Sequence, residues 1–544
     1  QKFALGIFSP HLLNGPMASS EKSTRSSSDQ REHKKILFFT SSEYGQANVI
    51  LAVAYELLLR REYQVHFASF AILENRIREL NELAATDDST AAVFHTIPGA
   101  SSAEALNAKD EFIGPYPAGI RGALDTYRVT LPAMANTWDE REYMLGYESC
   151  IHILQAINPD IIVADPLFSQ GLDACLKMSR KCVVLSPNTF QDILRKRQPL
   201  SRLQFFLYPA YVYTHFQATG IDRYRISSAF PYPVPWHLIL ANIFLKISLI
   251  WILITSPTVR TLISWRKAQN LPALPPVFNI WQKENYYLVP SIPETDFPCH
   301  LESNVTACGP ILLPFPSVAE VDPELQAWLI RGPTVLINLG SHIRMDGSMA
   351  RQFAASLKYL LDKRPDIQVL WKLKTTRTPA FQNGTSSKSN LNGDLRIAGL
   401  EEGPLDALSN ELATGRVKVL EWLSVDPLAM LQTGHVVCSV HHGGSNSFHE
   451  ALSAGVPQIV LPCWLDTFEF ANRVEYLGIG IYGSRSAAPR VEAGELSRAL
   501  ARVLGDGEEA YSMRRQAREL AEISGRVGGR VKACEKINEL LEHI

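Results

Sequence analysis

The feature that most constrains the fold of this sequence is an alternation of short apolar runs with segments of helical period. Residues 36–40 form an apolar run, residues 49–59 have a helical pattern, and residues 65–70 again have the pattern of a strand. This order predicts a βαβ unit. The runs at 161–164 and 182–185 are apolar throughout, as parallel strands buried on both faces require. The first part of the chain is therefore predicted to form a doubly wound parallel sheet.

A second set of strands and helices follows a proline-rich stretch. Pro310, Pro314, Pro316 and Pro323 interrupt the alternation with residues that continue neither a helix nor a central strand. Beyond them, strands are predicted at residues 335–339, 368–373, 417–420, 435–440 and 458–461. The fold class is therefore predicted to be α/β, with two Rossmann-like doubly wound domains.

The limits of these domains follow from the same pattern. We expect a disordered leader at 1–33, an N-terminal domain at 34–312, a linker at 313–324, a C-terminal domain at 325–526 and a final helix at 527–544. The final helix is amphipathic and is expected to pack back on the N-terminal domain. The polar, glycine-bearing stretch 377–394 is predicted to be a surface loop.

Charge and cysteine content exclude some partners. Lys plus Arg is 53 against 55 for Asp plus Glu, a net charge of −2, and no basic stripe is present, so nucleic acid is not expected as a partner. The eight cysteines form no CxxC pair and have no zinc-site spacing. We expect a reducing, cytoplasmic location and no bound metal.

One segment, residues 238–254, is nearly all apolar and does not fit the alternation. It has 17 residues and contains Asn242 and Lys246, so it is at the short limit for a membrane-spanning helix. A charge near the centre of a span costs about 2.5–3.5 kcal/mol. We expect either a buried helix that lines an apolar pocket or an interfacial helix, which leaves peripheral membrane contact open.

The stretch 441–447, with the sequence HHGGSNS, is the most informative for chemistry. It follows an apolar strand and opens a helix that ends at Gly455. Glycines allow a ligand to approach the backbone, and the free N–H groups and dipole of the helix start favour an anion. Asn446 and Glu450 share a helix face, so amides for a diphosphate and a carboxylate for a ribose diol form a plausible nucleotide site. The histidines do not indicate zinc, because Ser453 stands where an HExxH helix would need its second histidine.

Residues 422–466 resemble the signature of the family 1 UDP-dependent glycosyltransferases, especially its fungal branch. The matching residues are Trp422, His442, Asn446, Ser447, Glu450, Pro462 and Asp466. The resemblance extends through residues 470–480 and, more weakly, over about 34–544. It implies the GT-B arrangement, in which the two domains face a cleft, the N-terminal domain holds the acceptor and the C-terminal domain holds the UDP-sugar.

The resemblance also implies roles for these residues. Trp422 would stack on uracil, His442 and the amides of residues 446–447 would hold the diphosphate, Glu450 would bind the ribose, and Asp466 would bind the sugar. The full set expected at the donor is Ser341, Trp422, His442, Gly444, Asn446, Ser447, Glu450, Asp466 and Thr467. Thr467 stands where the family usually has Gln, so the identity of the sugar stays open.

The position of the family's general-base histidine is occupied by Gln46, which cannot accept a proton. Asp165 stands where the family has the aspartate that orients this histidine. One hypothesis makes Asp165 the base, directly or through a water, while Gln46 positions the acceptor. A second is that the acceptor ionises easily. An Asp at the end of a buried strand is also a common structural acceptor of loop amides.

The predicted function is inverting transfer of a sugar, expected to be glucose, from a UDP-sugar to a small hydrophobic acceptor such as a secondary metabolite. His442 and the helix start would receive the charge of the leaving UDP, and no cofactor beyond this co-substrate is expected. The aromatic and aliphatic content of residues 208–251 favours an apolar acceptor. Two alternatives remain: a membrane-associated lipid or sterol glycosyltransferase, and a non-catalytic UDP-sugar-binding homologue that lost turnover with Gln46.

Overall fold

The computed structural model describes residues 33–87, 90–108, 114–194, 228–276, 281–341, 343–375 and 403–543. The predicted leader, apart from His33, and the predicted loop at 377–394 lie outside these residues. Residues 34–544 form one compact unit, and this unit contains two parallel sheets.

The first sheet has seven strands in the order β3-β2-β1-β4-β5-β6-β7. The strands are β1 (Lys34–Phe39), β2 (Tyr63–Phe70), β3 (Val93–Ile97), β4 (Ile161–Ala164), β5 (Val183–Leu185), β6 (Tyr286–Val289) and β7 (Val305–Ala307). Along β1, Ile36 and Phe38 face one buried cluster, while Leu37 and Phe39 face another. The apolar run in the sequence therefore reflects burial on both faces of the sheet.

The second sheet has six strands in the order β10-β9-β8-β11-β12-β13. The strands are β8 (Thr334–Asn338), β9 (Gln368–Lys372), β10 (Val417–Leu420), β11 (Val436–His441), β12 (Gln458–Val460) and β13 (Gly480–Tyr482). All strand pairs of both sheets are parallel. The prediction of two doubly wound α/β halves is confirmed.

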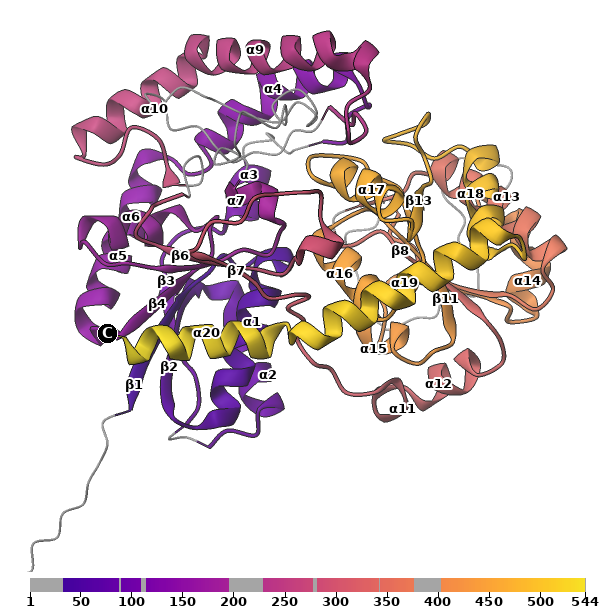
Figure 1. Ribbon diagram of the computed structural model, residues 1–544, viewed down its shortest axis with the longest axis horizontal. Helices are drawn as coiled ribbons and strands as arrows, with labels where there is room; N and C mark the ends of the chain where they lie inside the picture. Colours follow the sequence, from indigo (N-terminus) through magenta and orange to yellow (C-terminus); the bar gives the residue numbers. More distant parts are fainter. Residues whose placement is uncertain are drawn as a thin grey trace, which may run out of the picture. The chain divides into compact units, whose positions relative to one another are not determined.

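Helices cover the faces of both sheets (Figure 1). In the N-terminal half they are α1 (Tyr44–Arg60), α2 (Glu74–Leu83), α3 (Ser102–Ala108), α4 (Ile120–Ala135), α5 (Glu140–Ile157), α6 (Ser169–Lys177), α7 (Phe190–Leu194), α9 (Ile239–Thr255) and α10 (Pro257–Ala268). In the C-terminal half they are α11 (Val318–Val321), α12 (Pro323–Leu329), α13 (Gly347–Lys363), α14 (Ser409–Ala413), α15 (Pro427–Leu431), α16 (Ser445–Ser453), α17 (Thr467–Tyr476), α18 (Ala493–Leu504) and α19 (Glu508–Val527). The last helix is α20 (Arg530–Glu542).

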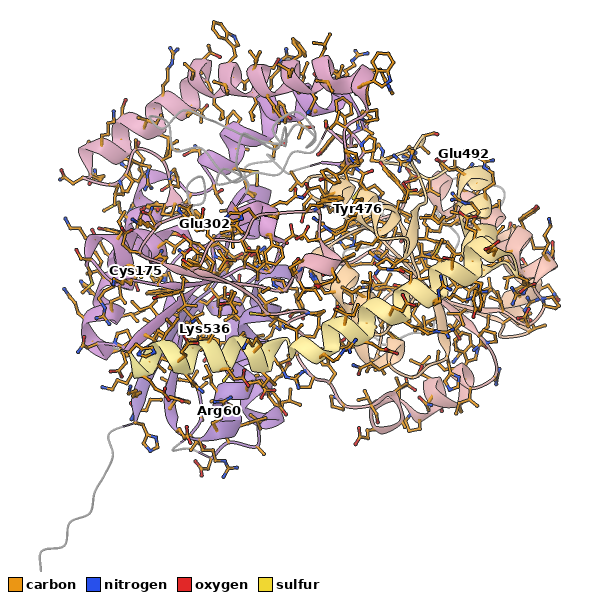
Figure 2. All side chains as sticks on the ribbon, in the orientation of Figure 1. Arg60, Cys175, Glu302, Tyr476, Glu492 and Lys536 are labelled. Carbon is orange, nitrogen blue, oxygen red and sulfur yellow. The ribbon has the colours of Figure 1, made fainter. Side chains whose placement is uncertain are left out.

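Helix α20 packs on the first sheet's helix α1, so the end of the chain belongs to the N-terminal half (Figure 1). The turn before it needs glycine, because a Cβ at Gly529 would lie 2.1 Å from the oxygen of Pro310. Arg530 then forms an ion pair with Glu56 of α1, with 2.6 Å between Nε and Oε1. On the same helix, Lys536 (Figure 2) lies over the ring of Tyr286 in β6.

Polar and aromatic contacts join the two halves. Arg473 of α17 donates to Asp296 at 2.8 Å, and neither side chain is exposed. Ser445 Oγ donates to the carbonyl of Pro187 at 2.6 Å. The ring of Tyr476 (Figure 2) packs on those of Tyr232 and Phe297, with centroids 5.4 and 5.2 Å away. The contacts of Ser445 and Arg473 join α16 and α17 to the loops that follow β5 and β6.

Candidate functional site

A cleft of about 1720 Å³ is lined by residues of both halves. Loops at the carboxyl ends of β1, β8 and β11 contribute to it, as does the first turn of α16, which is where ligands bind in open parallel sheets. The predicted residues that line it are Gln46, Ser341, Trp422, His442, Gly444, Asn446, Ser447, Glu450 and Asp466. Asp165 and Thr467 do not line it.

The turn between β11 and α16 is fixed by His441. Its Nδ1 accepts a hydrogen bond from the amide of Gly443 at 3.1 Å, and its Nε2 donates to Gln458 Oε1 at 2.8 Å. Burial lowers the pKa of His441 to about 4, so the ring is neutral and one nitrogen is free to accept. Gly443 has φ of 88°, and a Cβ there would lie 2.7 Å from the carbonyl oxygen of Thr467. His441 therefore supports the turn, and the neighbouring His442 is the histidine that faces the cleft.

His442 lies between two glycines. A Cβ at Gly340 would come within 2.8 Å of His442 Cε1, and a Cβ at Gly444 within 2.7 Å of Cε1 and Nε2. Gly444 is also the N-cap of α16. Because glycine has no side chain, the N-cap residue accepts no hydrogen bond from the first amides of the helix. An imidazole beside a glycine-capped helix start is suited to bind an anion such as a diphosphate.

The ring of Trp422 is 54% exposed and lies against two lysines. The Nζ atoms of Lys372 and Lys374 are 3.8 and 5.1 Å from its centroid, and Lys374 also donates to the carbonyl of Ser341 at 2.8 Å. Burial and the charge of Lys374 lower the pKa of Lys372 to about 8. Lys372 was not among the predicted site residues, although it is the last residue of β9, at the carboxyl end of the sheet where ligands bind.

Glu450 lies in an acidic pair that faces an arginine of the other half. Burial, followed by the charge of Asp426, raises the pKa of Glu450 to about 8. Burial raises the pKa of Asp426 to about 6, partly offset by a hydrogen bond from the amide of Leu428 and by Arg76 of α2. The Arg76 guanidinium lies 4.3 Å from the ring of Tyr44. The ribose end of the expected donor site is therefore linked electrostatically to the N-terminal half.

The structure does not support the predicted sugar contact of Thr467. Its side chain is 1% exposed, and Oγ1 accepts hydrogen bonds from the amides of Cys463 and Trp464, each at 3.2 Å. Thr467 thus fixes the loop before α17, whereas the neighbouring Asp466 reaches the cleft.

Asp165 lies behind the β1–α1 loop and not in the cleft. Its Oδ2 accepts from the amide and hydroxyl of Ser41 at 3.0 and 2.5 Å, and its Oδ1 accepts from the amide of Leu167 at 2.8 Å. The residue has no exposed surface. Direct proton transfer from an acceptor in the cleft to Asp165, one of the two sequence hypotheses, therefore lacks a path in this geometry. Its visible role is to hold the loop.

Glu43 of this loop and Gln46 in the first turn of α1 do line the cleft. Gln46 has a buried Oε1 that accepts no hydrogen bond from the residues that the structure describes. Glu43, which the sequence argument did not single out, accepts a hydrogen bond from the amide of Ala103 at 2.8 Å through Oε1. No group of three metal-ligating side chains occurs within the described ranges.

The chain matches a known glycosyltransferase over nearly its whole length. The glycosyltransferase sdnJ of Sordaria araneosa is 36% identical over 540 residues, covering 93% of this chain and 97% of that protein. Residues 401–524 match the family model described as erythromycin biosynthesis protein CIII-like, C-terminal domain. A shorter match, 50% identical over 48 residues, covers 9% of this chain and 4% of the sterol 3-beta-glucosyltransferase of Komagataella phaffii.

Solved structures match the fold. A UDP-glucosyltransferase from Polygonum tinctorium capable of glucosylating indoxyl, in complex with 3,4-dichloroaniline, has a TM-score of 0.58 and 16% identity, and the match covers 94% of this chain and 99% of that one. Phytolacca americana UGT2, in complex with UDP-2-fluoro-glucose and pterostilbene, has a TM-score of 0.57 and 15% identity, with the same coverage. At these identities the likeness concerns the two-domain fold.

Proposed function

The chain belongs to the family 1 glycosyltransferases of GT-B fold, and on that premise we propose that it moves a sugar from a UDP-sugar to a small apolar acceptor. The observation that carries this proposal is the position of His442 between two glycines and beside the start of α16, in a cleft that both halves line. Glucose is the sugar we propose, because the sterol and indoxyl enzymes compared above are named glucosyltransferases.

The donor is proposed to lie along the C-terminal wall of the cleft. Trp422 stacks on the base, with Lys372 adding positive charge beside it. Glu450 accepts hydrogen bonds from the ribose, and Asp466 accepts them from the sugar. His442 and the first amides of α16 hold the diphosphate. The opposite wall supports an apolar acceptor, since it includes Leu51, Leu83, Leu106, Met134, Trp138, Leu167, Leu262 and Trp265.

The reaction is direct displacement with inversion. The acceptor oxygen forms a bond to the anomeric carbon while the bond from that carbon to the diphosphate oxygen breaks. Negative charge grows on the leaving UDP, where His442 and the helix amides already point donors at it. Their placement before the reaction means that little reorganisation is needed as the charge develops.

A donor panel tests this proposal. The purified protein is incubated with UDP-, TDP- and GDP-sugars and a mixture of apolar alcohols, phenols and carboxylic acids, and products are identified by mass spectrometry. We expect a mass gain of one hexose with a UDP-sugar. Firm UDP binding without any product would favour the non-catalytic homologue, and absence of UDP binding would refute the donor assignment.

A second candidate function is glycosyl transfer at a membrane surface, favoured by the inverted polarity of α9. The polar residues Asn242 and Lys246 of this helix are 0% and 5% exposed, so they face the protein. Its large exposed residues are instead apolar, namely Trp236 just before it, Leu240, Phe244, Ile247, Trp251 and Ile254. The window Trp236–Thr255 is long and apolar enough to cross a membrane, and 28% of it is buried.

This exposed stripe fits a helix lying in a lipid interface better than a helix in water. Exposed Arg260 and Lys267 on the adjoining α10 would complement anionic headgroups. Thr258, Thr261 and Trp265, also on α10, line the cleft. An acceptor dissolved in the membrane would therefore be near the site where it reacts, and we propose peripheral binding to anionic membranes as this second candidate.

Vesicle flotation tests the membrane candidate. We predict that the wild-type protein floats with vesicles of phosphatidylcholine containing phosphatidylserine, and that a double variant, Phe244→Glu with Ile247→Glu, loses about tenfold or more of this binding because charge enters the stripe. Ile330→Glu places one such charge at an exposed apolar position of the other half and is the control. Equal flotation of the double variant and the control would contradict the assignment.

A further inference from the structure

Transfer to an alcohol leaves one proton without an acceptor. As the acceptor oxygen bonds to the anomeric carbon, its O–H bond breaks, and the proton must go to a base within hydrogen-bond reach. The amide of Gln46 has no useful proton affinity. Both oxygens of Asp165 are occupied by Ser41 and Leu167, and the residue has no surface in the cleft.

The carboxylates that the N-terminal half contributes to the cleft are Glu43, Glu79, Glu82, Asp139 and Glu140. All but Glu43 are exposed to solvent. Asp139 is in addition the N-cap of α5 and accepts from the amide of Glu142 at 2.8 Å. Glu43 differs from the others because it is partly buried and its side chain is held by a separate element, through the amide of Ala103 in α3.

Glu43 is also placed beside Gln46. Glu43 is the N-cap of α1, and Gln46 is the third residue of that helix, with its amide 3.0 Å from the carbonyl of Glu43. Side chains three residues apart at a helix start lie on the same face. One oxygen of Glu43, Oε1, is fixed by Ala103, and Oε2 accepts no hydrogen bond from another residue in the described part of the chain. Oε2 is therefore available to a ligand.

We propose that Glu43 is the general base of the transfer, taking the acceptor proton on Oε2 while Gln46 binds the acceptor through its side-chain amide. This inference rests on the function proposed above. In the transfer step, the acceptor oxygen bonds to the sugar and its proton moves to Glu43. UDP leaves with the electron pair of the broken bond. The protonated Glu43 then releases its proton to solvent as the product departs. Gln46 Nε2 donates to the acceptor oxygen, which leaves the single O–H proton of the acceptor for Glu43.

The surroundings of Glu43 favour basicity. Burial raises the pKa of its carboxyl above the usual range, and the charges of Asp165 at the end of β4 and Glu104 of α3 raise it further. The hydrogen bond from Ala103 opposes this shift. Asp165 thereby gains a second role, since its negative charge makes the carboxylate in front of it a better base. A carboxylate with a raised pKa accepts a proton more readily at neutral pH.

The test compares wild type with Glu43→Gln and Glu43→Asp in steady-state kinetics, after the donor panel has identified a substrate pair. The Gln variant keeps an oxygen that can accept from Ala103, so the loop is retained. We expect kcat to fall by about 100-fold or more with Gln, to fall less with Asp, and donor affinity measured by calorimetry to stay within about threefold.

The acidic limb of the pH–rate profile should disappear in the Gln variant. Glu74→Gln, on the exposed first turn of α2, is the control and should keep wild-type kinetics.

The outcomes separate the two proposals. If the Gln variant turns over at a rate close to wild type and keeps the acidic limb, Glu43 is not the base. If rates instead follow the acceptor pKa across a series of phenols and are the same in wild type and variant, the acceptor ionises without a base and the inference is overturned. If the wild-type protein gives no product with any donor, the proposed function fails, and the assignment of Glu43 fails with it.

Discussion

At the scale of single residues, the donor site contains carboxylates whose burial changes their protonation. Burial raises the pKa values of both Glu450 and Asp426, and the charge of Asp426 raises the pKa of Glu450 further. A carboxyl whose pKa is higher in the folded than in the unfolded chain contributes stability below its unfolded pKa, and this contribution is lost as pH rises through the folded pKa. For Glu450, the stabilising contribution is therefore lost between pH 4.5, its ordinary pKa, and about pH 8, its pKa in the folded protein.

Glu450→Gln should therefore raise stability at pH 8 more than at pH 5. The amide of glutamine cannot ionise, so the variant does not lose stability between pH 4.5 and pH 8 as the wild type does. Each unit of the pKa shift corresponds to about 1.4 kcal/mol, so a gain of at least that size is expected at pH 8. Thermal unfolding midpoints of both proteins at the two pH values provide the measurement, and a pH-independent difference would contradict the environment described for Glu450.

Residue roles were predicted unequally well from the sequence. Nine of the expected site residues line the cleft. Those from His442 to Glu450 are placed there by the glycine turn and the start of α16, and the other four were expected from the family resemblance. Asp165 and Thr467 were not predictable in the same way, since each could turn toward the cleft or toward nearby amides. Glu43 was not predicted, because it is held by the amide of Ala103 in α3, which lies 60 residues later in the sequence.

At the scale of elements, the start of α16 depends on glycine for space and not for backbone freedom. Gly444 has φ of −69°, which any residue adopts, but a Cβ would meet the imidazole of His442 at 2.7 Å. Gly444→Ala should therefore displace His442 and lower turnover by about tenfold or more, with a modest loss of stability of about 1–3 kcal/mol. Gly507→Ala is the matched control, because Gly507 also caps a helix with φ of −77° and a Cβ there meets nothing within 4 Å.

Turnover with a UDP-sugar and thermal unfolding of the two glycine variants provide the measurement. Wild-type turnover in Gly444→Ala would show that His442 need not occupy the position seen here. A comparable loss in Gly507→Ala would show that the effect is a general response to loss of a glycine cap.

Among the strands, the edge strand β10 was predicted at 417–420, whereas the edge strands β3 and β7 of the first sheet, and β6 beside β7, were not predicted. β1, β4, β8 and β11 are compact apolar runs, whereas β3 lies at the edge of the first sheet and includes half-exposed His95 and exposed Thr96. β7, the other edge, has three residues. An exposed or very short strand has few apolar residues in a row, so its sequence pattern is weaker. The final helix also begins later than predicted, at Arg530, because Gly528 and Gly529 have positive φ.

At the scale of the whole molecule, the site exists because two halves far apart in sequence share one cleft. Glu43 and Gln46 belong to the N-terminal half, while Trp422, His442 and Glu450 belong to the C-terminal half. The buried pair of Arg473 and Asp296 joins the halves close to this cleft, where removal of one partner would leave an uncompensated charge. The sequence predicted two domains and a cleft through resemblance, but it contained no signal for which side chains of the two halves would meet.

Turnover of a UDP-sugar by His442→Ala decides whether this cleft binds and activates the donor. We expect kcat to fall by about 100-fold or more, because the variant removes a donor aimed at the charge of the leaving UDP. His435→Ala, which changes a histidine outside the cleft, should keep wild-type turnover. Unfolding midpoints should show that both variants remain folded. A folded His442→Ala protein with wild-type turnover would contradict the claim that this cleft binds and activates the donor.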